Sequence, residues 1–137
     1  MEIKELKPTS IWHYFDAITG VPRPSKKEER IREFLLNFAK EQNLEVKVDK
    51  TGNVVITKEA TPGCEGAPTV ILQAHMDMVC EKNGDVKHDF ERDPIETYID
   101  GEWVKARGTT LGADNGIGMA AAMAGFSGKK LESTRVQ

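Results

Sequence analysis

The spacing of apolar positions predicts two amphipathic helices in the first third of the chain. In Pro8–Gly20 apolar residues recur at helical spacing, with Thr9 and Ser10 as candidate N-caps. Ser25–Glu28 fits a capping box, in which the hydroxyl and the carboxylate each satisfy a free backbone amide at the start of a second helix. The prolines of Val21–Pro24 predict a rigid connector between the two helices. The apolar face of the second helix comprises Ile31, Phe34, Leu35, Phe38 and Ala39.

Four further ranges of the chain have the pattern of strands. Residues 45–49 and 53–57 alternate apolar and polar positions around a tight turn, which predicts an antiparallel pair. Residues 97–105 contain an Asp-Gly pair between two β-prone runs and predict a hairpin. Thr69–Ala74 is a continuous apolar run, the pattern of a strand buried on both faces, and such a strand needs helices on either side of its sheet.

The run of small residues in Met119–Ala124 predicts a helix against which another element packs closely.

This order of helices and strands indicates an α/β protein, and the composition narrows its class. At 137 residues the chain has the length of one domain. A net charge of −3 with scattered basic residues argues against a nucleic-acid partner, and the longest apolar runs are too short to span a membrane. We expect Cys64 and Cys80 to be free thiols, and Trp12 and Trp103 to be core residues.

A candidate site follows the buried strand. His75 and Asp77 come directly after Thr69–Ala74, and if the extended geometry persists both side chains point the same way. An imidazole there can coordinate a metal while the carboxylate holds the ring. His-x-Asp alone is also compatible with an ordinary hydrogen-bonded histidine, so both interpretations stay open on this pair.

Asp114 is the second candidate, in a glycine-rich turn before the last helix. The glycines at 112, 116 and 118 do not match a phosphate-binding loop, because the motif residues of such loops are missing and a carboxylate would repel phosphate. The alternating oxygen ligands of a calcium loop are missing too. Asp114 is therefore either a plain N-cap or an ionised carboxylate that can bridge cations.

Longer stretches around these residues resemble a known family. Residues 71–79, 88–90, 93–95 and 98–119 resemble peptidase D, the bacterial aminoacyl-histidine (Xaa-His) dipeptidases of the co-catalytic zinc exopeptidase family. The resemblance extends, more thinly, from the N-terminal helix to about Ala124. It implies an α/β fold that is the N-terminal portion of a zinc-exopeptidase catalytic domain, with a mixed sheet flanked by helices.

The resemblance also assigns roles to the candidate residues. It implies that His75 and Asp114 are metal ligands, with Asp114 bridging two Zn²⁺ ions, and that Asp77 clamps the His75 ring as part of the catalytic apparatus. The implied activity is zinc-dependent hydrolysis of small dipeptides, preferentially Xaa-His, in the cytoplasm. It allows a homodimer in full-length members.

The chain departs from the family after Asp114. The glutamate pair and the remaining ligands are expected beyond this residue and are not found, and residues 125–137 form a polar tail unrelated to the family pattern. We expect residues 1–124 to be an incomplete catalytic domain without its lid and dimerisation domain, and residues 125–137 to be disordered or the product of a frameshift. Apolar surface should then be exposed around Thr69–Ala74, and the chain should be weakly active or inactive. The alternatives are a non-catalytic α/β remnant or interaction fragment, and a metal-independent binding module, for which the sequence offers no positive feature.

Overall fold

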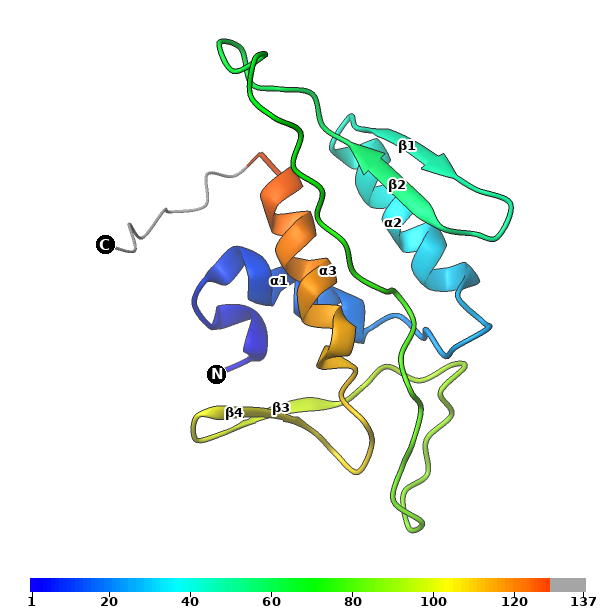
Figure 1. Ribbon diagram of the computed structural model, residues 1–137. Coiled ribbons are helices and arrows are strands. Elements are labelled where there is room, and N and C mark those ends of the chain that lie inside the picture. The colour runs from blue at the N-terminus through cyan, green and yellow to red at the C-terminus, as the bar shows by residue number, and fades with distance from the viewer. Residues whose placement is uncertain (129–137) are drawn as a thin grey trace.

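The structure, a computed structural model that describes residues 1–128, combines helices with two β-hairpins (Figure 1). Its α/β class agrees with the prediction. None of the described helices is long and apolar enough to cross a membrane. The elements in chain order are a 3-10 helix η1 (Ile3–Glu5), α1 (Thr9–Thr19), α2 (Glu29–Glu41), β1 (Glu45–Val48), β2 (Val54–Thr57), β3 (Thr97–Asp100), β4 (Trp103–Ala106) and α3 (Ala113–Phe126).

Both predicted N-terminal helices are confirmed, but their predicted caps are wrong. Pro8 occupies the N-cap position of α1, so Thr9 and Ser10 lie inside the helix and neither caps it. The capping box at Ser25–Glu28 is also absent, since α2 begins at Glu29 without a side-chain cap. The Glu28 carboxylate instead accepts a hydrogen bond from the Lys26 amide at 2.8 Å.

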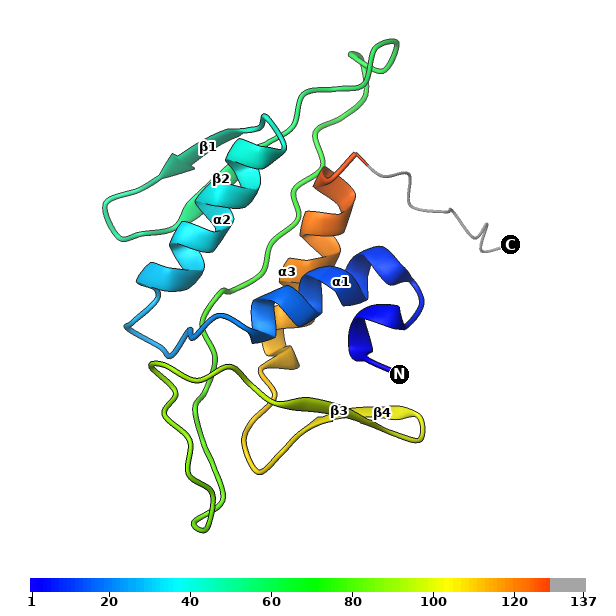
Figure 2. The ribbon, with the colours of Figure 1, turned by 180° about the vertical axis from the view of Figure 1, so that it is seen from behind.

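The core forms where α1 packs across α3, which Figure 2 shows from behind. Phe15 and Ile18 of α1 are fully buried, and so are Ala120 and Ala124 of α3. The small α3 side chains let the two helix backbones approach each other closely, so the predicted close packing on this helix is confirmed. Ile31 and Phe38 of α2 belong to the same core cluster.

The two hairpins form as the sequence predicts. β1 pairs antiparallel with β2, with Glu45 opposite Thr57 and Val48 opposite Val54, and this hairpin contacts α2. β3 pairs antiparallel with β4. Trp12 is partly buried against the core, whereas Trp103 is 69% exposed, so its assignment to the core is wrong. Burial alternates along β4, and Trp103 lies at an outward position.

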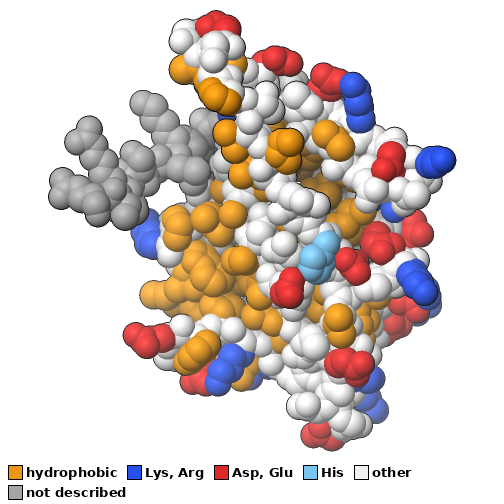
Figure 3. Space-filling model, viewed as in Figure 1, with side chains coloured by type: hydrophobic (Ala, Val, Ile, Leu, Met, Phe, Trp, Pro, Cys, Tyr) orange, Lys and Arg blue, Asp and Glu red, His pale blue; other side chains and the backbone are white. Residues whose placement is uncertain are grey.

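Thr69–Ala74 is not a strand, and the prediction that it is buried on both faces is wrong. The segment runs between α3 and the β1–β2 hairpin in both ribbon views (Figures 1 and 2), yet it pairs with no strand among residues 1–128. Val70 is 77% exposed, Ile71 85% and Leu72 54%. A buried strand needs hydrogen-bonded neighbours and a layer on each face, and the described residues supply neither. The expected exposure of apolar surface is confirmed, and Figure 3 shows a broad area of hydrophobic side chains on this side of the molecule.

The boundary predicted after Ala124 falls within α3, which continues to Phe126. Most of the predicted tail, residues 129–137, lies outside the described residues, and its disorder or frameshift stays a prediction.

Candidate metal centre

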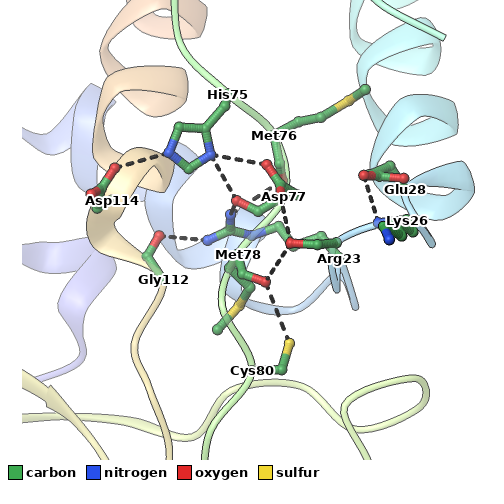
Figure 4. A network of polar contacts seen from close by, with 11 residues as sticks. Arg23, Lys26, Glu28, His75, Met76, Asp77, Met78, Cys80, Gly112 and Asp114 are labelled. Atoms are coloured by element: carbon green, nitrogen blue, oxygen red, sulfur yellow. Dashed lines mark hydrogen bonds and ion pairs between the residues drawn. The ribbon is translucent and has the colours of Figure 1, made fainter. Parts of the chain in front are cut away.

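His75 lies between two carboxylates (Figure 4). Its Nδ1 is 3.1 Å from Oδ1 of Asp77 and 3.0 Å from the Asp77 backbone oxygen. Its Nε2 is 2.9 Å from Oδ1 of Asp114. The structure therefore brings all three predicted site residues together, across 39 residues of sequence in the case of His75 and Asp114.

Asp77 is held in turn by Ser25. The Ser25 hydroxyl donates a hydrogen bond to Oδ2 of Asp77 at 2.5 Å, and so leaves Oδ1 facing His75. The segment bearing Asp77 is joined to the connector by a backbone bond from the Met78 amide to the Arg23 oxygen, at 3.0 Å. Pro24 and Met78 form an isolated parallel bridge at the same place.

Asp114 lies at the start of α3 but does not cap it. The N-cap position is taken by Gly112, with φ 75°, and Asp114 and Asn115 have non-helical backbone angles. The Asp114–Asn115 peptide bond is cis. The Asp114 side chain is 95% exposed and contacts His75. Asp114 therefore does not act as a plain N-cap, and its role as a cation ligand stays a prediction.

The hydrogen bonds shift the acidities in the site. The contact with Asp114, and secondarily those with Asp77, raise the pKa of His75 above its ordinary value against an opposing effect of burial. The hydrogen bond from Ser25 lowers the pKa of Asp77, and the contact with His75 lowers it further. At neutral pH Asp77 can therefore accept a hydrogen bond from a proton on Nδ1 of His75. When the imidazole is neutral and carries its proton on Nδ1, its free electron pair is on Nε2, which faces Asp114.

These donors fit a zinc ion in kind. Imidazole nitrogen and carboxylate oxygen are ordinary zinc ligands, and a ligating histidine typically has its other ring nitrogen held by a carboxylate, as Asp77 does here. Nε2 of His75 and Oδ1 of Asp114 are 2.9 Å apart, an ordinary hydrogen-bond distance, so both atoms lie on the same side of the imidazole, where they could hold one cation. Within residues 1–128, however, no group of three or more His, Cys, Asp or Glu side chains is arranged to hold a metal.

Known proteins share this architecture, although no family model matches the chain. Over 123 residues, 90% of its length, the chain is 54% identical to the cytosol non-specific dipeptidase of Escherichia coli (strain K12), of which it covers 25%. The chain also matches the crystal structure of aminoacylhistidine dipeptidase from Vibrio alginolyticus, with 54% identity and a TM-score of 0.92. The match covers 95% of this chain and 26% of the dipeptidase chain. The resemblance to peptidase D is confirmed. The chain spans about a quarter of the length of these peptidase D relatives.

Sequence reasoning missed two residues beside the candidate ligands. Ser25 fitted a helix cap, and its bond to Asp77 depends on a segment 52 residues away. Arg23 lay between two prolines in the connector, and nothing in that local pattern distinguishes it from a surface arginine. It is 1% exposed, and its guanidinium donates to backbone oxygens on both sides of the site. Both residues precede the His-x-Asp stretch, in the part of the chain where the resemblance to peptidase D is weaker.

Proposed function

We propose that this chain supplies part of the metal centre of a zinc-dependent dipeptidase. His75 and Asp114 are the metal ligands, and Asp77 orients the His75 ring. The observation that carries the proposal is the contact of His75 Nε2 with Asp114 Oδ1 while Nδ1 is held by Asp77. The relatives support it, since both are named as dipeptidases.

The chemistry of such a centre follows from its donors. A pair of zinc ions, when bound, activates a water molecule and polarises the scissile carbonyl of the substrate. Asp114 has two carboxylate oxygens and is almost fully exposed, so it can bridge two cations, and Asp77 fixes the tautomer and orientation of the imidazole. The substrate class we propose is small dipeptides, preferentially Xaa-His, with the cytoplasm as location and a homodimer as the assembly of the full-length protein.

The 137-residue chain by itself is proposed to be weakly active or inactive. A catalytic zinc usually has three protein ligands, and the described residues bring together one histidine and one exposed carboxylate for this purpose. Among His, Cys, Asp and Glu, the sequence after Asp114 contains only Glu132, which lies outside the described residues. Hydrolysis of a Xaa-His dipeptide by the pure chain, abolished by a chelator and by Asp114→Ala, would overturn this part of the proposal.

A chimera tests the role of the residues directly. The matching segment of the Escherichia coli dipeptidase is replaced by the 123 residues that align with it, and hydrolysis of Xaa-His dipeptides is measured with and without chelator. We expect chelator-sensitive activity that His75→Ala and Asp114→Ala abolish, while the exposed control Val55→Thr leaves it unchanged. A folded chimera whose activity survives either site substitution contradicts the proposed ligands. A folded but inactive chimera favours the non-catalytic remnant.

A further inference from the structure

Arg23 is the largest fully buried side chain of the described residues and lies directly beneath the candidate ligands (Figure 4). One terminal nitrogen, Nη1, donates to the backbone oxygens of Met76 at 3.2 Å and Asp77 at 3.3 Å. The other, Nη2, donates to the backbone oxygen of Gly112 at 2.6 Å. A single guanidinium therefore joins the segment that bears His75 and Asp77 to the turn that bears Asp114.

Two glycines of the turn make room for this guanidinium. A Cβ atom on Gly112 would lie 2.5 Å from Arg23 Nη2 and 2.9 Å from the Met78 sulfur, and φ there is positive. A Cβ atom on Gly116 would lie 2.8 Å from the same Nη2 and 3.1 Å from the Phe15 ring. Gly112 and Gly116 thus have a physical reason other than phosphate binding, because they make room for a buried arginine under the site, whereas a Cβ atom on Gly118 would meet the Asn115 side chain.

The charge of Arg23 is compensated mainly by backbone dipoles. Within residues 1–128 it forms no ion pair, although Asp77 is close enough to oppose the lowering of its pKa by burial. Burying a cation costs free energy unless hydrogen bonds satisfy it, and here three carbonyl oxygens do so. The planar fork of arginine can reach two segments at once, which a lysine ammonium cannot do with the same geometry.

We infer that Arg23 is a positioning residue that fixes the distance between the His75–Asp77 segment and the Asp114 turn. Its role in the metal centre rests on the proposed function. Its role in holding the two segments does not, because that role depends only on the hydrogen bonds from the guanidinium to the backbone oxygens of Met76, Asp77 and Gly112.

The test uses the 137-residue chain with Arg23→Lys, which keeps the charge and loses the fork, and Gly116→Ala, which invades the guanidinium space. Phe38→Leu in α2 is the matched core control. The first readout is the rate of hydrogen exchange at the Met78 amide, measured without metal and compared with the exchange rates of amides within α2. The Met78 amide is informative because it donates to the Arg23 backbone oxygen. The second readout is the affinity for Zn²⁺ alone.

We expect Arg23→Lys and Gly116→Ala to speed exchange at Met78 by about tenfold relative to α2, and to weaken zinc binding by about 10- to 100-fold. Phe38→Leu should change exchange uniformly and leave zinc affinity intact. Uniform exchange changes in both site variants, or undiminished zinc affinity, would overturn the inference. If the unsubstituted chain binds no zinc, the proposed metal centre fails, and the exchange comparison alone decides the role of Arg23. If Arg23→Lys does not fold, Gly116→Ala decides it.

Discussion

The hydroxyl of Ser25 donates to Asp77 at 2.5 Å and joins the connector after α1 to the segment that carries the candidate metal ligand His75. Because Ser25 takes Oδ2, the remaining oxygen of Asp77 faces the imidazole. The contacts continue through His75 to Asp114. The orientation of the imidazole thus depends on a residue of the connector as well as on its own neighbours.

Removal of the Asp77 charge should weaken metal binding without removing a ligand. In Asp77→Asn the side chain keeps its size, but the charged acceptor for Nδ1 is lost, so we expect zinc affinity to fall by about 10- to 100-fold. Calorimetry or a competition assay measures this. Unchanged affinity in a folded Asp77→Asn variant would show that the carboxylate does not hold the ring.

Ser25→Ala should raise the pKa of Asp77 toward its ordinary value, because the hydrogen bond from Ser25 is the largest cause of its lowering. A carboxyl with a lowered folded pKa contributes stability above its unfolded pKa, and this contribution is lost as the pH falls through the folded pKa. The variant should therefore lose part of that contribution at neutral pH. A carbon-13 NMR titration of the Asp77 carboxyl measures its pKa in both proteins. An equal pKa in Ser25→Ala and in the unsubstituted chain would contradict the role of the Ser25 hydrogen bond.

The β1–β2 turn should resist acid. Asp49 accepts hydrogen bonds from the backbone amides and the side chains of Thr51 and Asn53, led by the Thr51 hydroxyl, and these hold its pKa far below the ordinary value. The stabilisation is thus present above pH 4 and persists until the pH falls through that lowered pKa. We expect the Asn53 amide resonance to be insensitive to pH between about 6 and 3 in the unsubstituted chain, and Asp49→Asn to weaken the turn across this range. Titration of Asp49 near its ordinary value contradicts the assignment.

The packing of α1 on α3 should be sensitive to side-chain volume. Ala120 is fully buried there, and Ala120→Leu is expected to lower the free energy of unfolding by about 1–3 kcal/mol through overpacking. The neighbouring Ala121 is exposed, so Ala121→Leu is the matched control and should change the free energy of unfolding by less than about 0.5 kcal/mol. Denaturant unfolding measures both, and equal effects would contradict the observed helix contact.

Elements whose signals are local were predictable from the sequence. The helices around Phe15 and Ile31 and both hairpins follow from periodicity and turn residues, because each forms its backbone hydrogen bonds within a short stretch. Thr69–Ala74 was not predictable in this way, since whether a β-prone run becomes a strand depends on partners distant in sequence.

In the candidate site, too, local features were predictable from the sequence and tertiary contacts were not. The proximity of His75 and Asp77 follows from their spacing, whereas the contact with Asp114 depends on the tertiary fold and was expected only through the resemblance to peptidase D. The sequence pattern around Ser25 predicts a helix cap that the structure lacks, because capping motifs are short and recur by chance. Arg23 had no local signal, because its burial depends on glycines about 90 residues away.

An NMR titration of the nitrogen-15-labelled chain with Zn²⁺ tests whether His75 and Asp114 are metal ligands. This measurement detects even the weak binding expected of an incomplete ligand set. We expect chemical-shift changes concentrated at His75, Asp77 and Asp114, which disappear in His75→Ala and in Asp114→Ala and persist in the exposed control Val55→Thr. Shifts that are absent up to about millimolar zinc, or that survive both substitutions, would contradict this role of His75 and Asp114.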